Sequence, residues 1–397
     1  MKRAAWLQET RDMRFLQTYE EWETGRLTQS EAAQILGICE RTFRRQLVKY
    51  EADGMDALLD KRLNQPSRRK ASPDEGIKLA QMYRASFANY NVRHFHQIYQ
   101  DRGGLDGRTR SYSWVKSVLQ GQQLVKVAKA RGKYRIKRER KPLPGMMIHQ
   151  DASTHRWVAG AVWDLVVTMD DATNEHLDMR FCAQEGTASS MAGIKAVLRS
   201  KGIPSSFYSD RGAHYWSTPT AGGKVDKVNL TQFGKAMQRL GIEMIAAYSP
   251  QARGRSERAF KTHQGRLPQE LASAGITTMQ GANAYLKDVY MPSFNKHFTV
   301  AASQDGTAYV PLRGFDANEM LSERHERVVS NDNCVSYTKL KLQIPADRHR
   351  HHYVRAKVQV RIDCEGQISL YHGPRLLAQY DDQGELLLAE LKNGTTG

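Results

Sequence analysis

The sequence predicts a multidomain α+β protein with helical units first, a mixed sheet flanked by helices in the middle, and a small β-barrel near the end. The 397 residues indicate two to four domains, since a domain commonly has about 100–200 residues. Helical spacing of apolar residues dominates the first third of the chain, strand-like runs begin at Gly145, and short strands with tight turns follow residue 330. A hydrophobic content of 40%, with 17 Tyr and 11 Phe, is enough to build real cores.

The charge balance favours a polyanionic partner. The chain has 59 Lys and Arg against 42 Asp and Glu, a net charge of +17, which suits DNA, RNA or anionic lipid. No run approaches the roughly 18 apolar residues that span a bilayer, and Met1–Glu9 lacks the apolar region of a secretory signal. The four cysteines lie far apart, which argues against a zinc knuckle or disulfide framework. We therefore expect no membrane partner and a cytoplasmic, nucleoid-associated protein.

Residues 1–64 are interpreted as a helix-turn-helix domain. Thr28-Gln29-Ser30-Glu31 forms a capping box, in which the Thr hydroxyl and the Glu carboxylate satisfy each other's backbone N–H. The helix that it opens stops at Gly37, and a three-residue turn leads into a second helix, Glu40–Tyr50. This second helix is basic enough to enter a major groove through Arg41, Arg44 and Arg45. The alternative is an ordinary helical hairpin with a solvated basic face.

A second helical unit, residues 72–125, and a basic linker, residues 126–144, follow. The helical unit is either a further DNA-binding unit or a purely structural bundle. In the linker, Lys126–Lys141 contains nine basic residues and one acid. Such a run is commonly a solvated linker, but between two DNA-handling parts we expect it to contact phosphates without reading sequence. The residues chosen for this contact are Lys133, Arg135, Lys137 and Arg138.

Residues 145–300 are predicted to form the mixed sheet, with the order βββαβαβα. Three strands, 146–151, 162–169 and 177–182, read as an antiparallel meander. Two further strands, 206–210 and 244–248, alternate with helices. Behind this core, residues 330–383 contain five short strands and are predicted to form the small barrel, and residues 384–397 a tail.

Three acids stand apart from the surface population of charges. Asp151 ends the first predicted strand of the core, Asp210 ends the fourth, and Glu257 lies on the first turns of the last helix. In a βββαβαβ sheet the first and fourth strands are neighbours, so two carboxylates meet and a helix can close the cluster. Like charges at short range need cations, and Mg²⁺, with Mn²⁺ as its substitute, is the natural choice for oxygen ligands. The alternative is that each acid merely caps or turns the chain.

These segments resemble an insertion-sequence transposase of the DDE class, in the retroviral-integrase-like superfamily. The matching segments are His149–Ser153, Met169–Thr173, Tyr208–Asp210 and, most specifically, Ser249–Ala259. The resemblance implies an RNase H-like core with Asp151, Asp210 and Glu257 as catalytic metal ligands. It also implies binding to terminal inverted repeats and DNA strand transfer. The separation of the second and third acids is longer than in the family's commonest form, and Ser217–Lys227 is the expected insertion.

The neighbours of the three acids are assigned as follows. Arg255, Arg258 and Lys261 make the last helix basic and are expected to contact DNA; for Lys261, four residues after Glu257, a plain salt bridge is the alternative. Structural roles, rather than catalytic ones, are expected for Asp170 and Asp171 in a hairpin turn, Glu185 in a first helical turn, and His149 as a packed or surface residue.

The expected function is a Mg²⁺-dependent DNA transposase that nicks the ends of its element and joins the freed 3′-OH to target DNA. Its partners are double-stranded DNA, as element ends and as target, and further copies of the chain, at least a dimer when assembled on DNA. Two alternatives stay open: a DNA-binding regulator without catalysis, and an RNase H-like nuclease that only hydrolyses.

Overall fold

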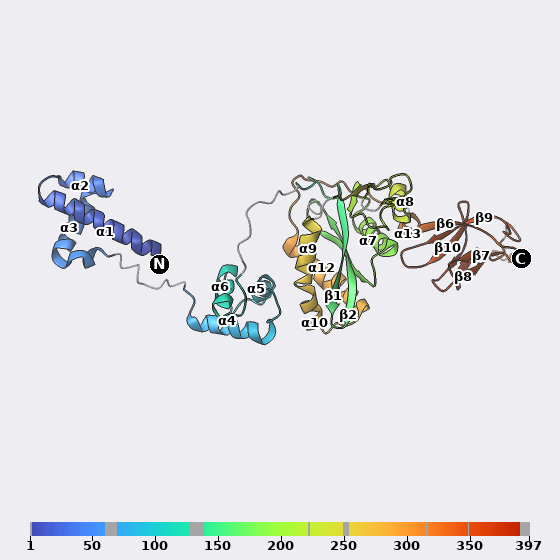
Figure 1. Ribbon diagram of the computed structural model, residues 1–397, viewed down its shortest axis with the longest axis horizontal. Coiled ribbons are helices and arrows are strands. Elements are labelled where there is room, and N and C mark those ends of the chain that lie inside the picture. Colours follow the sequence, from blue (N-terminus) through green and yellow to red (C-terminus); the bar gives the residue numbers. More distant parts are fainter. Residues whose placement is uncertain are drawn as a thin grey trace, which may run out of the picture. The chain divides into compact units, whose positions relative to one another are not determined.

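The computed structural model describes residues 2–59, 70–127, 139–220, 223–248, 254–314, 316–347 and 349–389. By its internal contacts the chain divides into two compact units, Met1–Gln81 and Met82–Gly397 (Figure 1).

The first unit contains the helices expected of a helix-turn-helix. The capping box is present: Thr28 Oγ1 accepts the N–H of Glu31, and the Glu31 carboxylate accepts the N–H of Thr28 at 2.8 Å. The first of the two paired helices ends at Gly37, whose φ of 68° is a conformation that a residue without Cβ adopts at no cost. Phe43 is fully buried at the centre of an aromatic core. The helices are α1 (Lys2–Glu23), α2 (Gln29–Leu36), α3 (Glu40–Asp53) and the short 3₁₀ helix η1 (Gly54–Leu58).

Three helices follow, α4 (Pro73–Ser86), α5 (Val92–Asp101) and α6 (Tyr112–Gly121), and the first of them runs across the boundary between the two units. Tyr90, just before α5, donates or accepts a 2.6 Å hydrogen bond with Ser273 Oγ, and the Asn91 side chain donates to the carbonyl of Gly265 at 2.8 Å. The start of α5 is therefore anchored on helices of the core domain.

The central domain is built on a five-stranded sheet with the order β3-β2-β1-β4-β5. The pairs β1–β2 and β2–β3 are antiparallel, and the pairs β1–β4 and β4–β5 are parallel. This is the mixed sheet expected from the sequence. The strands are β1 (Ile148–Val158), β2 (Ala161–Asp170), β3 (His176–Cys182), β4 (Ser206–Ser209) and β5 (Glu243–Ala246).

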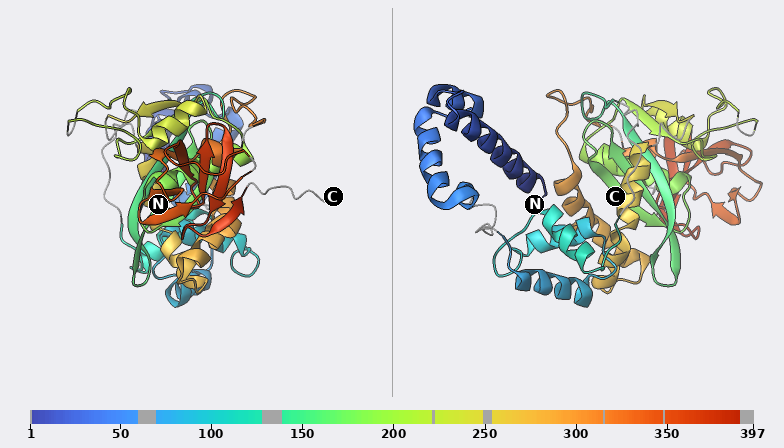
Figure 2. Two further views of the ribbon diagram at one scale, coloured as in Figure 1. Left: turned by 90° about the vertical axis from the view of Figure 1, so that its right-hand side faces the viewer. Right: turned by 60° about the vertical axis from the view of Figure 1, so that its left-hand side comes forward.

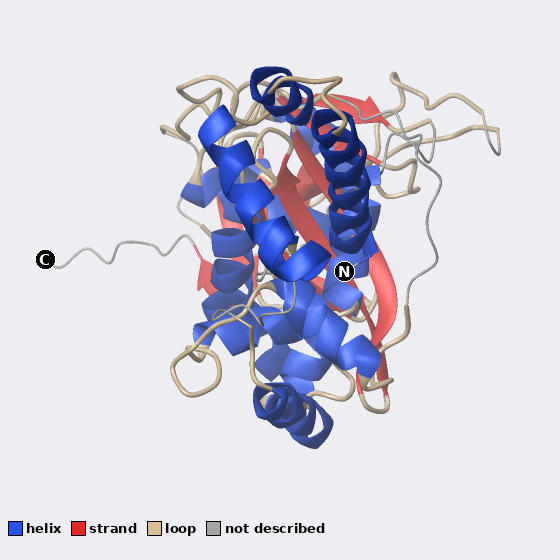
Figure 3. Ribbon diagram, turned by 90° about the vertical axis from the view of Figure 1, so that its left-hand side faces the viewer, coloured by secondary structure: helices blue, strands red, loops and turns tan. Residues whose placement is uncertain are grey.

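Helices cover both faces of this sheet (Figures 2 and 3). On one face, Ile148 and Phe207 pack with α7 and α8. On the other, Leu165 and Phe181 pack with the helices that follow β5. The helices of the first face are α7 (Thr187–Ser200) and α8 (Gln232–Arg239); those of the second are α9 (Gly254–Gln264), α10 (Leu267–Ser273), α11 (Met279–Tyr285), the π-helical η3 (Leu286–Tyr290) and α12 (Met291–Phe298).

One strand differs from the prediction in a way that matters for the site. The sequence predicts that the first strand ends at Asp151, whereas β1 continues to Val158. Among the described strands, the only one that pairs with the continuation is β2, which pairs with β1 from Ile148 to His155 and again at Val158, while β4 pairs only with Ile148 and His149. Asp151 therefore lies inside a strand, at the point where one of its two neighbours leaves.

The edge strand β3 is covered by two asparagine side chains. Asn283 accepts the N–H of Phe181 at 2.7 Å and donates to its carbonyl at 3.0 Å. Asn295 does the same for His176, with both distances 2.8 Å. Each amide thus satisfies one residue of the exposed edge as a further strand would.

The C-terminal domain is made of sheets, but they do not close into the expected barrel. Its strands form a five-stranded sheet, β12-β11-β10-β9-β6, and a separate pair, β7-β8. The two end strands of the larger sheet, β6 and β12, were not predicted, and β12 falls in the segment interpreted as a tail. The elements are α13 (Ala317–Met320), β6 (Glu323–Val328), β7 (Cys334–Tyr337), β8 (Leu340–Gln343), β9 (Lys357–Ile362), β10 (Ile368–His372), β11 (Arg375–Tyr380) and β12 (Leu386–Ala389).

Candidate active site

Asp151 and Asp210 lie on adjacent strands in the same register. The parallel pairing of β1 with β4 sets His149 opposite Tyr208, and each acid is two residues further along its own chain. Neighbouring strands are about 4.8 Å apart, and residues two apart share a face. Asp151 is buried, with 8% of its surface exposed, and Asp210 follows directly after β4. The register thus brings the two acids to the same face and level.

Helix α9 covers that face. Asp151 is paired with Val167 of β2, so it shares the face on which Val167 packs with Phe260. Asp151, Ser256 and Phe260 line one narrow cavity. Glu257 follows Ser256 on the first turns of α9 and is exposed. Each of the three acids therefore comes from the element that the sequence indicated, with α9 lying over β1.

The carboxylate oxygens suit a hard divalent cation such as Mg²⁺. The Asp151 carboxylate accepts the N–H of Ala152 at 3.0 Å, and that of Asp210 accepts the N–H of Gly212 at 2.9 Å. Within the described ranges, no three His, Cys, Asp or Glu side chains are grouped closely enough to hold a metal ion. The structure therefore brings together the positions of Asp151 and Asp210, and it does not gather Glu257 with them into one three-ligand cluster.

A buried ion pair fixes the start of α9. Arg255, two residues before Glu257, forms an ion pair with Asp171, which is fully buried after β2. Asp171 also binds Nε2 of His149 at 2.6 Å and the N–H of Lys141 at 2.8 Å. Burial alone would raise the pKa of the Asp171 carboxyl, but the hydrogen bonds from His149, Lys141 and Arg255 and the charge of His149 hold it well below its usual value.

This ion pair adds to the structural roles expected for His149 and Asp171. Both residues were expected to be structural, and both are. The sequence did not indicate that they meet or that Arg255 completes the cluster. The sequence offers only their positions as a hint: His149 and Arg255 each lie two residues before a proposed catalytic acid, and Asp171 directly follows the neighbouring strand β2.

A second buried network holds the loop after Asp210. The hydroxyl of Tyr215 donates to Gln150 on β1 at 2.9 Å and contacts Glu185 at 3.1 Å, and it accepts from Ser190 at 3.1 Å. Burial, together with the nearby Glu185, raises the pKa of Tyr215 well above its usual value. Because Gln150 precedes Asp151, this network ties the two acidic segments together through neutral side chains. The prediction of a first-turn position for Glu185 is wrong, because α7 begins at Thr187 with Gly186 as its N-cap, so Glu185 lies before the helix. No pattern in the sequence singled out Gln150 or Tyr215.

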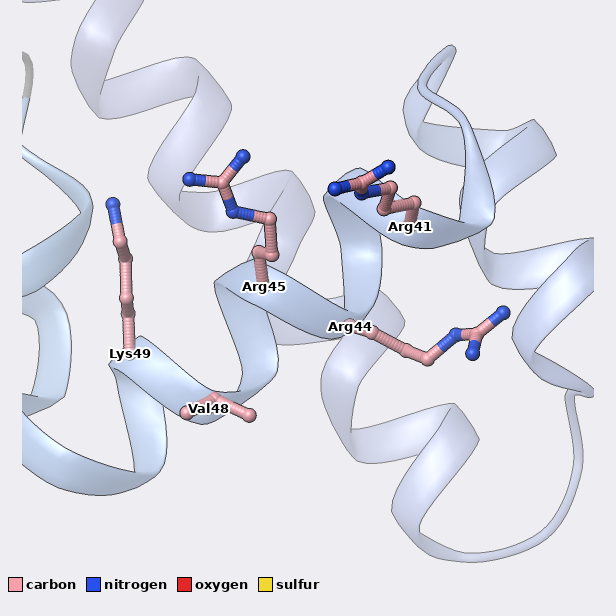
Figure 4. A pocket seen from close by; sticks show the side chains of 5 residues that line it. All are labelled: Arg41, Arg44, Arg45, Val48 and Lys49. Atoms are coloured by element: carbon pink, nitrogen blue, oxygen red, sulfur yellow. The ribbon is translucent and has the colours of Figure 1, made fainter.

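The basic face of α3 is exposed. Arg41, Arg45 and Lys49 recur every fourth residue and extend from one side of the helix (Figure 4). With Arg44 and Val48 they line a shallow hollow. Phe43 and Leu47 are buried on the opposite side, so the basic residues are presented outward.

The other residues expected to contact DNA differ in how far their side chains are exposed. Arg258 is exposed on α9, and its Nε donates to the carbonyl of Gly254 at 2.7 Å. Arg255, by contrast, has a side chain that is 10% exposed. Lys133, Arg135, Lys137 and Arg138 lie outside the described residues.

The amino-terminal part matches a family model described as a winged helix-turn helix, over residues 21–76. This range includes α2 and α3 and confirms the helix-turn-helix. A helix-turn-helix followed, after three further helices, by a mixed five-stranded sheet with helices on both faces defines the class of architecture.

Two curated proteins resemble the chain over most of its length. A putative transposase of Sinorhizobium fredii, y4bF, is 26% identical over 366 residues, covering 91% of this chain and 78% of the relative. The transposase of insertion sequence IS1202 from Streptococcus pneumoniae is 26% identical over 393 residues, covering 89% of this chain and 84% of the relative. The chain is thus similar over about nine-tenths of its length to two transposases, one of them from an insertion sequence, and the resemblance drawn from its motifs is confirmed.

Solved structures give more distant matches. An intasome of simian T-cell lymphotropic virus with PP2A regulatory subunit B56 gamma has a TM-score of 0.34 and 12% identity, covering 73% of this chain and 91% of the matched chain. The catalytic core domain of HTLV-2 integrase in complex with magnesium has a TM-score of 0.29 and 14% identity, covering 37% and 89%. Nothing is inferred from either at these scores. No helix in the described part of the chain is long and apolar enough to cross a membrane.

Proposed function

We propose that the chain is a DDE-type DNA transposase that nicks the ends of its element and joins the 3′-OH to target DNA. Asp151, Asp210 and Glu257 are the proposed catalytic residues and ligands of Mg²⁺, for which Mn²⁺ substitutes. The observation that supports the proposal is the register of β1 and β4, in which Asp151 and Asp210 are each two residues beyond the pair His149–Tyr208, together with the packing of α9, which bears Glu257, on β1. Relationship to two transposases supports the reaction class.

Each side chain has a distinct task in this proposal. Bound Mg²⁺ would supply charge neutralisation at the attacking and leaving oxygens of a phosphodiester. Asp151 is held in place within a strand, Asp210 by the loop that Tyr215 anchors, and Glu257 by the helix whose start Arg255 fixes. With a bound cation, Glu257 would join the other two acids as a ligand, because the cation would offset their mutual repulsion.

The DNA is held by basic residues on separate elements. Arg41, Arg44 and Arg45 on α3 are proposed to bind the element ends, since a basic second helix of a helix-turn-helix fits the major groove. Lys261, four residues after Glu257 on α9, is proposed to contact a phosphate near the cut. The basic run with Lys133, Arg135, Lys137 and Arg138 adds contacts that are independent of sequence. Because two ends must be brought together, the active form is a DNA-bound oligomer of at least two copies.

Replacement of Asp151 by Asn tests the catalytic part. The variant keeps the shape of the side chain and removes its charge, so Mg²⁺-dependent cleavage of end-containing DNA should be abolished while DNA binding persists. Unchanged cleavage would remove Asp151 from the mechanism. A DNA-binding regulator would show binding and no cleavage in the wild-type chain, and a simple nuclease would cleave without joining a pre-cut 3′-OH end to target DNA.

The role of the basic run is tested by its salt dependence. Each phosphate contact contributes about 0.9 to the slope of log affinity against log salt concentration. Deletion of residues 126–141 should therefore flatten this slope for end DNA. An unaltered slope would show that the run does not touch phosphates.

A further inference from the structure

A basic pocket lies on the face of α9 next to the start of the core domain. The pocket measures about 200 Å³ and is lined by Arg140, Arg255 and Arg258, by Asn174, and by the rings of Phe294 and Phe298. A water in the liquid occupies about 30 Å³, so this space takes on the order of six waters or a group of similar size. None of the described residues that line it is acidic.

The arginines are held in place by backbone contacts. Arg140 donates from Nη1 to the carbonyl of Ala172 at 3.1 Å, and Arg258 donates from Nε to that of Gly254. A guanidinium has five N–H donors, so each of these bonds uses one and leaves donors for a ligand. Arg255 is paired with Asp171, so its charge is largely offset, and Arg140 and Arg258 supply most of the positive potential of the pocket.

Two buried acids close to the pocket, Asp170 and Asp171, are held by other partners. Asp171 is held by His149, Lys141 and Arg255. Asp170 accepts the backbone N–H groups of Gly145, Ala172 and Thr173. The ion pair and these hydrogen bonds reduce the repulsion that the two carboxylates exert on an incoming anion.

We propose that this pocket binds a backbone phosphodiester of the DNA strand that reaches the acids, at a position other than the one that is cut. The inference rests on the proposed function, because the pocket lies on α9 and the same helix bears Glu257, one of the proposed catalytic residues. Arginine is suited to the ligand, since its planar fork binds two phosphate oxygens together. The phenylalanine rings exclude water from one side, which strengthens the charged contacts.

The test measures binding of end-containing duplexes to the Asp151→Asn protein, so that it does not depend on cleavage. Single phosphates of the duplex are replaced, one at a time, by neutral methylphosphonates. At one phosphate outside the cut site, this replacement should weaken binding of the duplex to the parent protein about tenfold, which is the size of a charge-assisted hydrogen bond. In the protein that also carries Arg258→Ala, the same replacement should cost nothing further. Lys296→Ala, an exposed basic residue on α12 that does not line the pocket, is the matched control and should preserve the tenfold effect.

A second variant keeps the result interpretable if α9 is disturbed. Arg140→Ala changes a different segment of the chain and should abolish sensitivity at the same methylphosphonate. Equal sensitivity of parent, Arg258→Ala and Arg140→Ala at every position would overturn the pocket proposal. Binding of inorganic phosphate in the pocket, with DNA binding unchanged in both arginine variants, would also overturn it. If the wild-type chain failed to cleave or join DNA while the methylphosphonate effect appeared, the proposed catalytic function would fail and the pocket would stand.

Discussion

Replacement of Asp171 by Asn should destabilise the central domain by about 3 kcal/mol. The carboxylate is fully buried and binds His149 and Arg255 with its charge. Loss of one partner from a buried pair costs about 3–5 kcal/mol. The lower end applies because the Asn oxygen still accepts the N–H of Lys141.

The chain has several domains, so a single unfolding curve would not isolate this effect. Hydrogen exchange of peptides covering 161–170 and 254–264 reports on the affected elements directly. A loss of about 3 kcal/mol makes the slowest amides exchange roughly 100-fold faster, at 1.36 kcal/mol per factor of ten. Asp288→Asn, an exposed acid of the same domain, should change nothing. Combined with Arg255→Met, Asp171→Asn should add less than the sum of the two losses; additive losses, or a change under threefold, would refute the coupling.

Three further outcomes follow from the structure. Burial lowers the pKa of His176 to about 4 and that of His263 well below its usual value, while in the unfolded chain both titrate near 6.5. Stability of the central domain should therefore be full above about pH 6.5 and fall by up to about 1.4 kcal/mol per pH unit for each histidine toward pH 4. Hydrogen-exchange protection of β3 and α9 that is equal at pH 7.5 and 5, after correction for intrinsic exchange rates, would contradict this. In Gly212→Ala, the new Cβ lies 3.1 Å from Asp210 Oδ1 and from the ring of His214, so Mg²⁺-dependent DNA cleavage should drop with little change in melting temperature; equal activity would show that the Asp210 loop tolerates crowding. Asn283→Ala exposes the N–H and carbonyl of Phe181 and should cost about 1–3 kcal/mol, measured as faster exchange of the β3 amides; protection equal to that of the wild type would mean that the clamp is dispensable.

The order of elements in the core, and which element carries each of the three acids, could be predicted because both follow from the local sequence pattern. Apolar runs of strand length alternate with helical spacing between Gly145 and Ala259, and a mixed sheet of this order sets the first strand beside the fourth. Asp151 and Asp210 then come close in the chain register because each is two residues beyond the paired residues His149 and Tyr208.

What the sequence could not supply depends on distant partners. Strand β6 reads Glu-Arg-His-Glu-Arg-Val, which has no apolar alternation, and it forms because β9 offers a neighbouring edge. The continuation of β1 past Asp151 is likewise imposed by β2. The Asp171–Arg255 pair joins residues that are far apart in the chain, and neither partner differs in the sequence from an ordinary surface charge.

The side chains of Asn283 and Asn295 protect part of the edge of the central sheet. An uncovered edge strand invites another molecule to continue the sheet, but at Phe181 and His176 the backbone groups that such a molecule would need are already used. Sheet extension through β3 is therefore blocked at these two positions. Another molecule could continue the sheet at these two residues only after displacing the side chains of Asn283 and Asn295.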